Sequence, residues 1–270
     1  MNKIKTALIS VSDKRNLQNL LSVLRKYDIK IISSGGTFRE IKKLGFNCVE
    51  VSKFTEFPEI LDGRVKTLHP KIHGGILSKR GNKKHSKEVR DNNLENIDLV
   101  IVNFYPFEKK IETSSNHNQI IENIDIGGPT MVRAAAKNYQ DVTVLTSSNQ
   151  YYELANQLKK NQGATSLEFR KKMSQSAFTE TAYYDSLIAN YFNEFTRNTF
   201  PQKKIIHSRL IEQLRYGENP HQKSSIYSFG NSLELKQLNG KQLSYNNFND
   251  IYAALTISKS LPINKGVVIV

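Results

Sequence analysis

The residues best suited to chemistry lie around residues 125–138 of the chain. The motif Asp125-Ile126-Gly127-Gly128-Pro129 places a carboxylate directly before two glycines and a proline. Glycine permits a close backbone approach and proline suits the first turn of a helix, so the motif predicts a turn that opens into a helix. Free amides at such a helix start attract an anion, on which Asp125 could act. Arg133 and Lys137 are four residues apart and share one helix face. The alternative interpretation is a core-packed helix with two solvated cations.

Four further polar clusters follow apolar runs or turns and carry groups that bind anions or move protons. They contain Ser12 and Lys14; Ser34, Gly36 and Thr37; Arg64, Lys66 and Thr67; and Asn103 and Tyr105. Arg64 and Lys66 are two residues apart, so in an extended segment both side chains project to one side and can grip one anion. Each cluster alone also fits plain turns, helix caps or surface cations.

Other catalytic and metal-binding patterns are weak. His69 and His73 have the spacing of a metal-binding pair but lack a third ligand at useful spacing, so we predict no metal site. The single cysteine, Cys48, has apolar neighbours and is interpreted as a core residue. Gly35 and Gly36 are adjacent, and no further glycine completes a dinucleotide-binding fingerprint.

The elements that must position these clusters alternate between strand and helix. Strand composition occupies residues 4–11, 29–32, 48–51, 97–102 and 142–145, and helical spacing occupies 17–24, 38–44, 150–160 and 167–195, with a glycine loop at 33–37. This alternation predicts an α/β fold with an open, mainly parallel sheet flanked by helices. Ligands of such sheets collect at the carboxyl ends of the strands, where the polar clusters fall.

A domain boundary is predicted near Pro201, where the helical signal stops. Residues 1–200 then form the first domain, and 201–270 form a linker and the start of a second. In the latter the pattern predicts a hairpin at 238–247, a helix at 249–259 and a buried strand at 266–270. About 70 residues make a small domain, so we expect 201–270 to be a truncated piece of a larger α/β domain.

Composition narrows the class of partner. The formal net charge is +14, from 39 Lys and Arg against 25 Asp and Glu, which favours anionic partners. Much of the excess is lysine scattered through polar segments, and no nucleic-acid-binding motif is present, so small phosphorylated metabolites are favoured over nucleic acid. No apolar run has a membrane helix's length and no signal peptide is evident, so we expect no membrane partner and a cytoplasmic location.

Together the motifs resemble a known family. Ser12-Asp13-Lys14, Ser34-Gly35-Gly36-Thr37, the segment from Gly63 to Pro70, Asn103-Phe104-Tyr105-Pro106-Phe107, Asp125-Ile126-Gly127-Gly128 and Arg133-Ala134-Ala135-Ala136-Lys137-Asn138 occur in this order. The whole chain resembles the bifunctional purine-biosynthesis enzymes that couple AICAR transformylase to IMP cyclohydrolase. Residues 1–200 resemble the cyclohydrolase domain, whose fold is shared with methylglyoxal synthase and with the regulatory domain of carbamoyl phosphate synthetase.

Residues from about 205 resemble the start of the transformylase domain, including Arg215-Tyr216-Gly217-Glu218-Asn219-Pro220-His221-Gln222. The family's catalytic Lys-His pair lies in a later Lys-His-x-x-Pro-Cys-Gly motif. This sequence stops at Val270, before that motif. We therefore expect this chain to close the purine ring but not to transfer the formyl group.

The resemblance implies a hydrolase acting on cyclic amidines: formyl-AICAR closes its ring to give IMP and water. It assigns binding of the substrate phosphate to Ser12, Lys14, Ser34, Gly36 and Thr37, with Arg64 and Thr67 nearby. It assigns stabilisation of the developing oxyanion to Lys66 and proton handling to Tyr105, Asp125 and Lys137. Further substrate contacts are assigned to Asn103, Gly127 and Gly128, and contacts with AICAR to Arg215 and Tyr216. Which proton-handling group is acid and which is base stays open, because burial can shift either kind of pKa.

The resemblance also implies partners. The cyclohydrolase needs no cofactor, 10-formyltetrahydrofolate is the co-substrate of the full-length transformylase, and the assembly is a homodimer. Two rival functions remain on the same fold: a methylglyoxal synthase, which would not need the Tyr105 loop or anything after residue 200, and a regulatory module that binds a nucleotide without catalysis.

Overall fold

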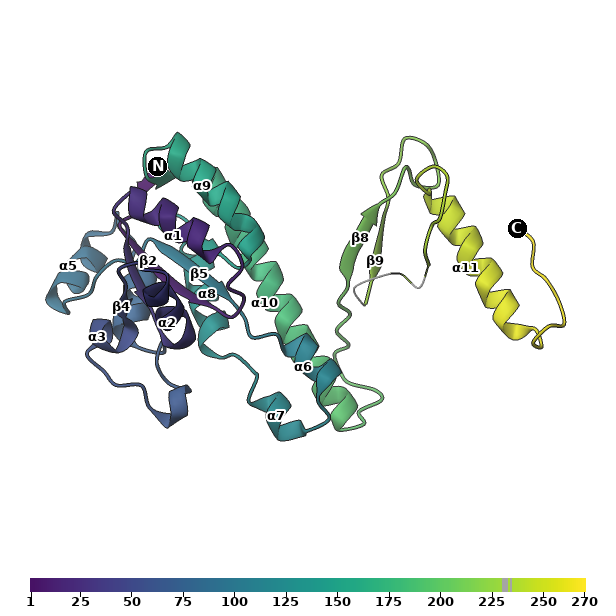
Figure 1. Ribbon diagram of the computed structural model, residues 1–270, viewed down its shortest axis with the longest axis horizontal. Coiled ribbons are helices and arrows are strands. Elements are labelled where there is room, and N and C mark those ends of the chain that lie inside the picture. Colours follow the sequence, from purple (N-terminus) through teal and green to yellow (C-terminus); the bar gives the residue numbers. More distant parts are fainter. Residues whose placement is uncertain (230–232, 234) are drawn as a thin grey trace. The chain divides into compact units, whose positions relative to one another are not determined.

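The computed structural model describes residues 1–229, 233 and 235–270. The chain divides into two compact units, Met1–Gln202 and Lys203–Val270. The first unit is built around one sheet with helices on both faces, and the second contains a two-stranded sheet and a helix (Figure 1). Each unit is described by itself below.

The first unit contains a five-stranded parallel sheet in the order β4-β3-β2-β5-β6. Its strands are β2 (Thr6–Val11), β3 (Lys30–Ser33), β4 (Val49–Glu50), β5 (Leu99–Asn103) and β6 (Thr143–Leu145). The central strand β2 is nearly all buried, as its apolar composition predicts. The predicted α/β fold with an open parallel sheet is therefore confirmed for this unit.

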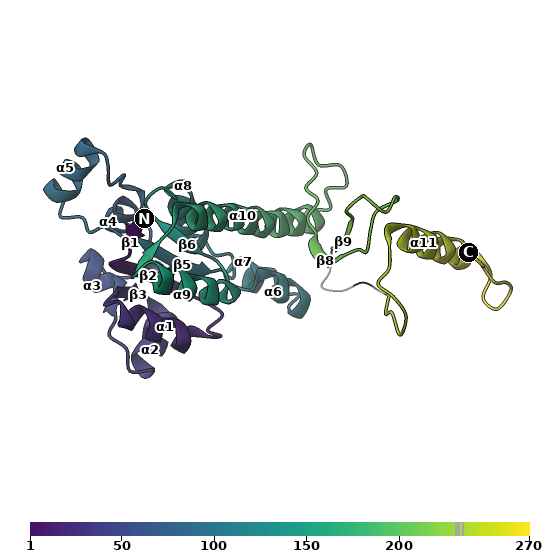
Figure 2. The same cartoon turned by 90° about the horizontal axis from the view of Figure 1, so that it is seen from above.

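Helices cover both faces of the sheet (Figure 2). One face carries α1 (Leu17–Lys26), α2 (Gly35–Lys43) and α9 (Tyr151–Lys160), and the other carries α4 (Pro70–Leu77), α8 (Gly127–Lys137) and α10 (Leu167–Phe195). The helices bury the residues that their spacing predicted, for example Leu17, Leu20, Leu21 and Leu24 in α1. This burial fixes the orientation of each helix start relative to the sheet edge.

Shorter elements complete the first unit. They are β1 (Asn2–Lys3) paired antiparallel with β7 (Ala164–Thr165), α3 (Val51–Thr55), η1 (Leu61–Gly63), α5 (Lys83–Asp91), α6 (Phe107–Thr113), α7 (His117–Ile121) and η2 (Ser148–Gln150). The segments α3 and η1 lie between β4 and α4, and they bring the Arg64–Thr67 motif to the sheet edge described below.

Two predictions at helix starts need correction. The glycine loop predicted at 33–37 is already helical from Gly35, because Gly35 has a left-handed φ of +53° that turns the chain from β3 directly into α2. At α8 the helix begins at Gly127, so Pro129 is its third residue and not its first. The first change places the amides of α2 directly after β3.

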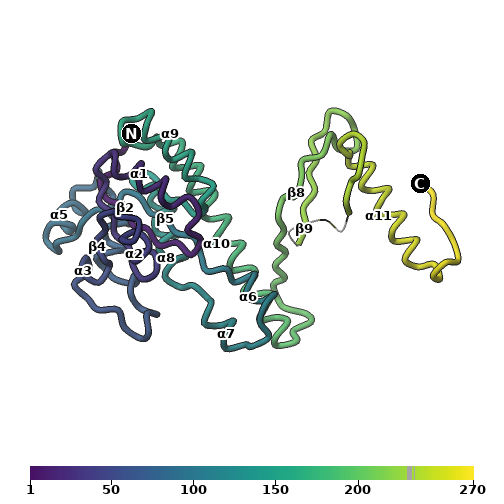
Figure 3. The backbone as a smooth tube through the Cα atoms, viewed as in Figure 1, coloured from purple at the N-terminus to yellow at the C-terminus, as the bar shows by residue number. Residues whose placement is uncertain are grey.

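The second unit contains β8 (Arg209–Gln213) paired antiparallel with β9 (Ser225–Ser228), followed by α11 (Tyr245–Ser260) (Figure 3). The predicted hairpin at 238–247 is wrong. Gly240 does turn with a φ of +94°, but the segment after it supplies Ser244, which caps α11 and starts the helix four residues before the predicted 249.

The strand predicted at 266–270 is also wrong. These residues are irregular, and Val267 and Ile269 are 85% and 89% exposed. A β-strand exists through its pairing, and no other segment in the described ranges pairs with this one. In the same ranges, no helix is both long enough and apolar enough to cross a membrane.

Candidate active site

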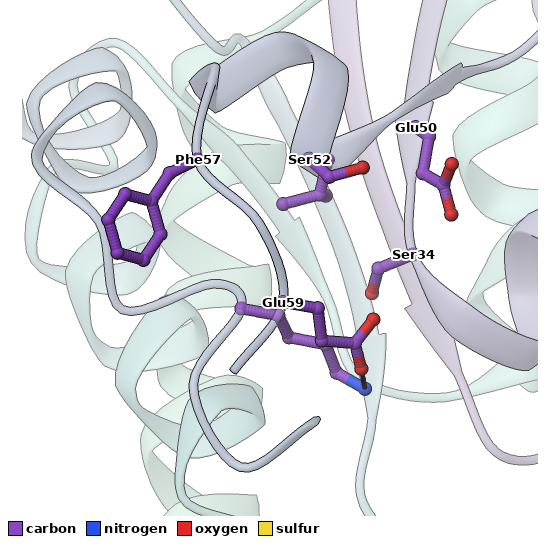
Figure 4. Close-up of a pocket in the computed structure, with 7 residues that line it drawn as sticks. Ser34, Glu50, Ser52, Phe57 and Glu59 are labelled. Carbon is purple, nitrogen blue, oxygen red and sulfur yellow. Dashed lines mark hydrogen bonds and ion pairs between the residues drawn. The ribbon is translucent and has the colours of Figure 1, made fainter. Parts of the chain in front are cut away.

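Lys66 lies in the segment between η1 and α4, which follows strand β4 at the carboxyl edge of the sheet. Its Nζ is 3.3 Å from Glu59 Oε1, and a Cβ built on Gly35 would lie 3.6 Å from the same Nζ. Figure 4 shows the Glu59 carboxylate and the Ser34 hydroxyl directed toward one space. The pocket is lined by Ser34, Glu50, Val51, Ser52, Phe57, Glu59 and Lys66. The ammonium group therefore lies beside the start of α2.

The start of α2 offers an anion seat. Ser34 is its buried N-cap and makes no capping hydrogen bond with its side chain, so its hydroxyl does not fill the site. The amides of Gly35, Gly36 and Thr37 occupy the first turn, where a helix has no acceptors of its own. The positive end of the helix dipole lies at this turn, and Lys66 Nζ lies beside its first residue, Gly35.

The Thr37 side chain has a different role from the one expected. Its Oγ1 accepts a hydrogen bond from the Val11 amide and donates one to the Val11 carbonyl, both at 3.0 Å and both buried. The hydroxyl ties α2 to the end of β2 and is not free for a phosphate. Only the backbone amide of Thr37 remains available for an anion.

Asp125 lies just before α8, and its Oδ1 accepts a hydrogen bond from the Gly128 amide at 2.8 Å. Burial raises the pKa of this carboxyl, while the Gly128 amide and the Lys66 ammonium partly oppose the shift. The Lys66 contribution places the two side chains in electrostatic reach of each other. A buried carboxyl whose pKa is raised is a candidate for proton transfer.

Gly127 and Gly128 permit two close approaches at the start of α8. A Cβ on Gly127 would lie 2.5 Å from Thr67 Oγ1, and one on Gly128 would lie 2.3 Å from Asp125 Oδ2. Both distances are shorter than real Cβ contacts, so a side chain at either position would force Thr67 or Asp125 to shift. Thr67 is buried, and it packs the Lys66 loop directly against the first turn of α8.

Tyr184 on α10 is a site residue that the sequence reasoning missed. The Asp125 amide donates a hydrogen bond to the Tyr184 hydroxyl at 2.8 Å. Burial, with contributions from Asp125 and Tyr105, raises the pKa of Tyr184 to about 12. Tyr105, which is 44% exposed, therefore lies near the same group. No local signal distinguished Tyr184, because it is 59 residues away in sequence on a long helix.

Asn103 holds the loop that carries Ser12 and Lys14. Its Oδ1 accepts from the amides of Ser12 at 2.6 Å and Asp13 at 2.9 Å, and its Nδ2 donates to the Asp13 carbonyl at 3.0 Å. The Asn103 side-chain amide thus holds the backbone of this loop, and its predicted contact with the substrate stays a prediction. Ser12 is half-buried and Lys14 is exposed.

Arg64 and Lys66 pair with different carboxylates in this structure. The expectation assumed an extended segment, but Arg64 has helical angles (φ −65°, ψ −28°) at the end of η1. Its guanidinium pairs with Glu122, and both side chains are largely exposed. Lys66 pairs with Glu59 instead, so each of the two cations has its own carboxylate partner.

Lys137 does not lie with Asp125 within one chain. It is the last residue of the 11-residue helix α8, while Asp125 precedes the first. A helix of this length rises about 15 Å, which exceeds the reach of a lysine side chain to a hydrogen bond. Lys137 is exposed, and Arg133 on the same face stacks over the Phe178 ring at 5.8 Å. The predicted part of Lys137 in proton handling stays a prediction, while Tyr105 and Asp125 lie near the same group.

Arg215 and Tyr216 belong to the second unit. The Arg215 guanidinium lies over the Tyr216 ring at 4.8 Å from its centre and contacts the phenol oxygen at 3.2 Å. Their contact with AICAR stays a prediction.

His69 and His73 both make hydrogen bonds to the backbone near the start of α4. His69 Nδ1 accepts a hydrogen bond from the Lys71 amide at the start of α4, and His73 hydrogen bonds the Thr67 backbone. The described residues contain no group of three or more His, Cys, Asp or Glu side chains that could hold a metal ion.

The fold and the site define a recognisable class. A family model described as an MGS-like domain matches residues 16–130. The crystal structure of ForH aligns with a TM-score of 0.63 and 29% identity, over 70% of this chain and 99% of that one. The first unit is therefore an MGS-like domain.

The second half of the chain gives the family. The model of the AICARFT/IMPCHase bienzyme matches residues 135–270, and the chain belongs to this family. Proteins named bifunctional purine biosynthesis protein PurH are 45% identical in Rhizobium rhizogenes, 50% in Prochlorococcus marinus and 45% in Clostridioides difficile, over 97%, 92% and 98% of this chain. The chain spans about half the length of these relatives: 50%, 48% and 52%.

Proposed function

We propose that the first unit is an IMP cyclohydrolase, which closes the purine ring of formyl-AICAR with loss of water. The observation that carries this proposal is the position of Lys66, between the anion seat of α2 and the buried carboxyl of Asp125. Ring closure is intramolecular, so a site that holds both ends of one molecule supplies much of the rate.

In the proposed mechanism the amides of Gly35, Gly36 and Thr37 bind the ribose phosphate. The carboxamide nitrogen of the substrate attacks its own formyl carbon, and the formyl oxygen gains negative charge. The Lys66 ammonium stabilises that oxygen, an interaction worth roughly a few kcal/mol in a site that excludes water. The attacking nitrogen loses one proton as the new C–N bond forms. The former formyl oxygen takes up two protons in all, one from that nitrogen and one from the formamide N–H of the substrate, and leaves as water while the C=N bond of the ring forms.

Asp125 and Tyr105 are the groups that we assign to these proton transfers. The raised pKa of Asp125 brings its titration closer to neutral pH, so the same group can accept one proton and later return it. Tyr105 is exposed at the edge of the site, where a substrate can reach its phenol. Ligand binding also requires Lys66 to exchange its contact with Glu59 for one with the substrate.

The test is to incubate the chain with formyl-AICAR and to record the ultraviolet spectrum of IMP as it forms. Lys66→Met should lower turnover by roughly a hundredfold or more. Lys172→Met is the matched control, because Lys172 also pairs with a glutamate, Glu153, at 2.7 Å but lies on α10. A chain that binds IMP and never forms it would instead be a regulatory module. Release of phosphate from a triose phosphate would instead identify a methylglyoxal synthase.

We propose that the second unit contributes to AICAR formylation in the longer protein, with 10-formyltetrahydrofolate as the formyl donor and no cofactor for the ring closure. Family membership of residues 135–270 supports this assignment. We further propose a cytoplasmic homodimer that acts on AICAR, formyl-AICAR and IMP. Calorimetric titration of AICAR into wild type and Arg215→Ala tests the assigned contact, and light scattering coupled to size exclusion tests the dimer.

A further inference from the structure

We infer that Tyr184 is a positioning residue that holds the turn before α8 and thereby directs the Asp125 carboxyl toward Lys66. The inference rests on the proposed function of this site and adds a residue to it. Tyr184 itself is not assigned any contact with the substrate.

The hydrogen bonds of Tyr184 lie on the backbone of the turn. Its hydroxyl accepts from the Asp125 amide at 2.8 Å and donates to the Asn123 carbonyl at 3.4 Å. Ile126, the N-cap of α8, makes no side-chain capping bond, and the Gly128 amide holds the carboxylate of Asp125 and not its backbone amide. The phenol therefore bridges both ends of the segment that sets the direction of Asp125.

The ring of Tyr184 is buried and packed between aromatic neighbours. It is 5% exposed and packs against Phe104 and Phe107, whose ring centres lie 4.9 Å and 6.1 Å away. These two residues follow β5, on either side of Tyr105. Because Tyr184 packs against residues that follow β5 and also hydrogen bonds the Asp125 turn, it fixes the position of this turn relative to the edge of the sheet.

The chemistry of the phenol fits a positioning role. A pKa of about 12 keeps the hydroxyl protonated near neutral pH, so it can accept from one backbone group and donate to the other at the same time. Proton transfer would require the phenol to release a bond to the turn. Asp125, with its own raised pKa, remains the group that exchanges protons.

The test compares Tyr184→Phe with Tyr191→Phe. Tyr191 is also on α10, and its hydroxyl also makes one 2.8 Å hydrogen bond, to His117 Nδ1. Each variant loses one hydroxyl and keeps its ring, so both should remain folded. We expect kcat to fall about tenfold in Tyr184→Phe, with KM for formyl-AICAR changed less than about twofold, because the phosphate seat is untouched. Tyr191→Phe should leave both constants within about twofold of wild type.

Amide hydrogen exchange gives a second measurement that does not depend on activity. The Asp125 amide should exchange about tenfold faster in Tyr184→Phe and at the wild-type rate in Tyr191→Phe. An unchanged Asp125 exchange rate overturns the inference, and so does faster exchange with an unchanged kcat. If the wild-type chain forms no IMP, the proposed function fails, and the exchange comparison alone then decides whether Tyr184 holds the turn.

Discussion

Replacing Gly128 with alanine tests the geometry of the site directly. The new Cβ would lie 2.3 Å from Asp125 Oδ2 and 2.9 Å from its Cγ. Ordinary contact begins near 3.4 Å, so the carboxyl must move by about 1 Å. A displacement of about 1 Å in a catalytic group costs on the order of a hundredfold in rate, or about 2.7 kcal/mol in the barrier.

The effect on stability should be small. Gly128 lies in the first turn of α8, where alanine gains up to about 1 kcal/mol over glycine. The loss of the hydrogen bond between the Gly128 amide and Asp125 Oδ1 costs about 1 kcal/mol. The two terms offset each other, so Gly128→Ala should be an inactive protein with nearly wild-type stability.

The assay measures IMP formation from formyl-AICAR together with the free energy of unfolding in urea. Gly81→Ala is the control, because a Cβ on Gly81 meets nothing within 4 Å and its activity should be unchanged. Wild-type turnover in folded Gly128→Ala would refute the assignment of Asp125 to the chemistry, since the substitution cannot leave that carboxyl in place.

Three further outcomes are expected. Thr37→Val leaves the buried Val11 amide and carbonyl without their partner and should lower the free energy of unfolding by roughly 1–3 kcal/mol, whereas Thr179→Val, at an exposed helix position, should change it by less than about 0.5 kcal/mol. Burial lowers the pKa of His73 below 6.5, so the unfolded chain binds a proton that the folded chain does not, and the free energy of unfolding falls as the pH drops through about 6.5 and below. In urea melts at pH 7.5 and 5.5, His73→Leu should show a smaller fall than wild type. An equal fall in both proteins would mean that another group causes it. Asp125→Asn should reduce turnover far more than affinity for IMP measured by calorimetry, and a loss confined to affinity would make Asp125 a ligand contact.

Local sequence patterns determined the elements of the first unit. The leucine spacing of α1 and the apolar run of β2 involve only a few neighbouring residues and do not depend on distant parts of the chain. Both elements could therefore be predicted from the sequence. The order of motifs such as Asp125-Ile126-Gly127-Gly128 was enough to identify the family. In the second unit the apolar residues 266–270 lack a paired strand, so composition alone misled the prediction.

Only the tertiary structure decided which of the site residues meet. Thr37 and Asn103 carry polar groups that fit a ligand, but the fold places backbone atoms of Val11 and Ser12 within their reach, and those atoms take the hydrogen bonds. Tyr184 contacts Asp125 only because α10 packs beside α8, and no pattern near either residue encodes that packing. A side chain's type and spacing follow from the sequence, whereas its partner depends on where distant elements bring their atoms.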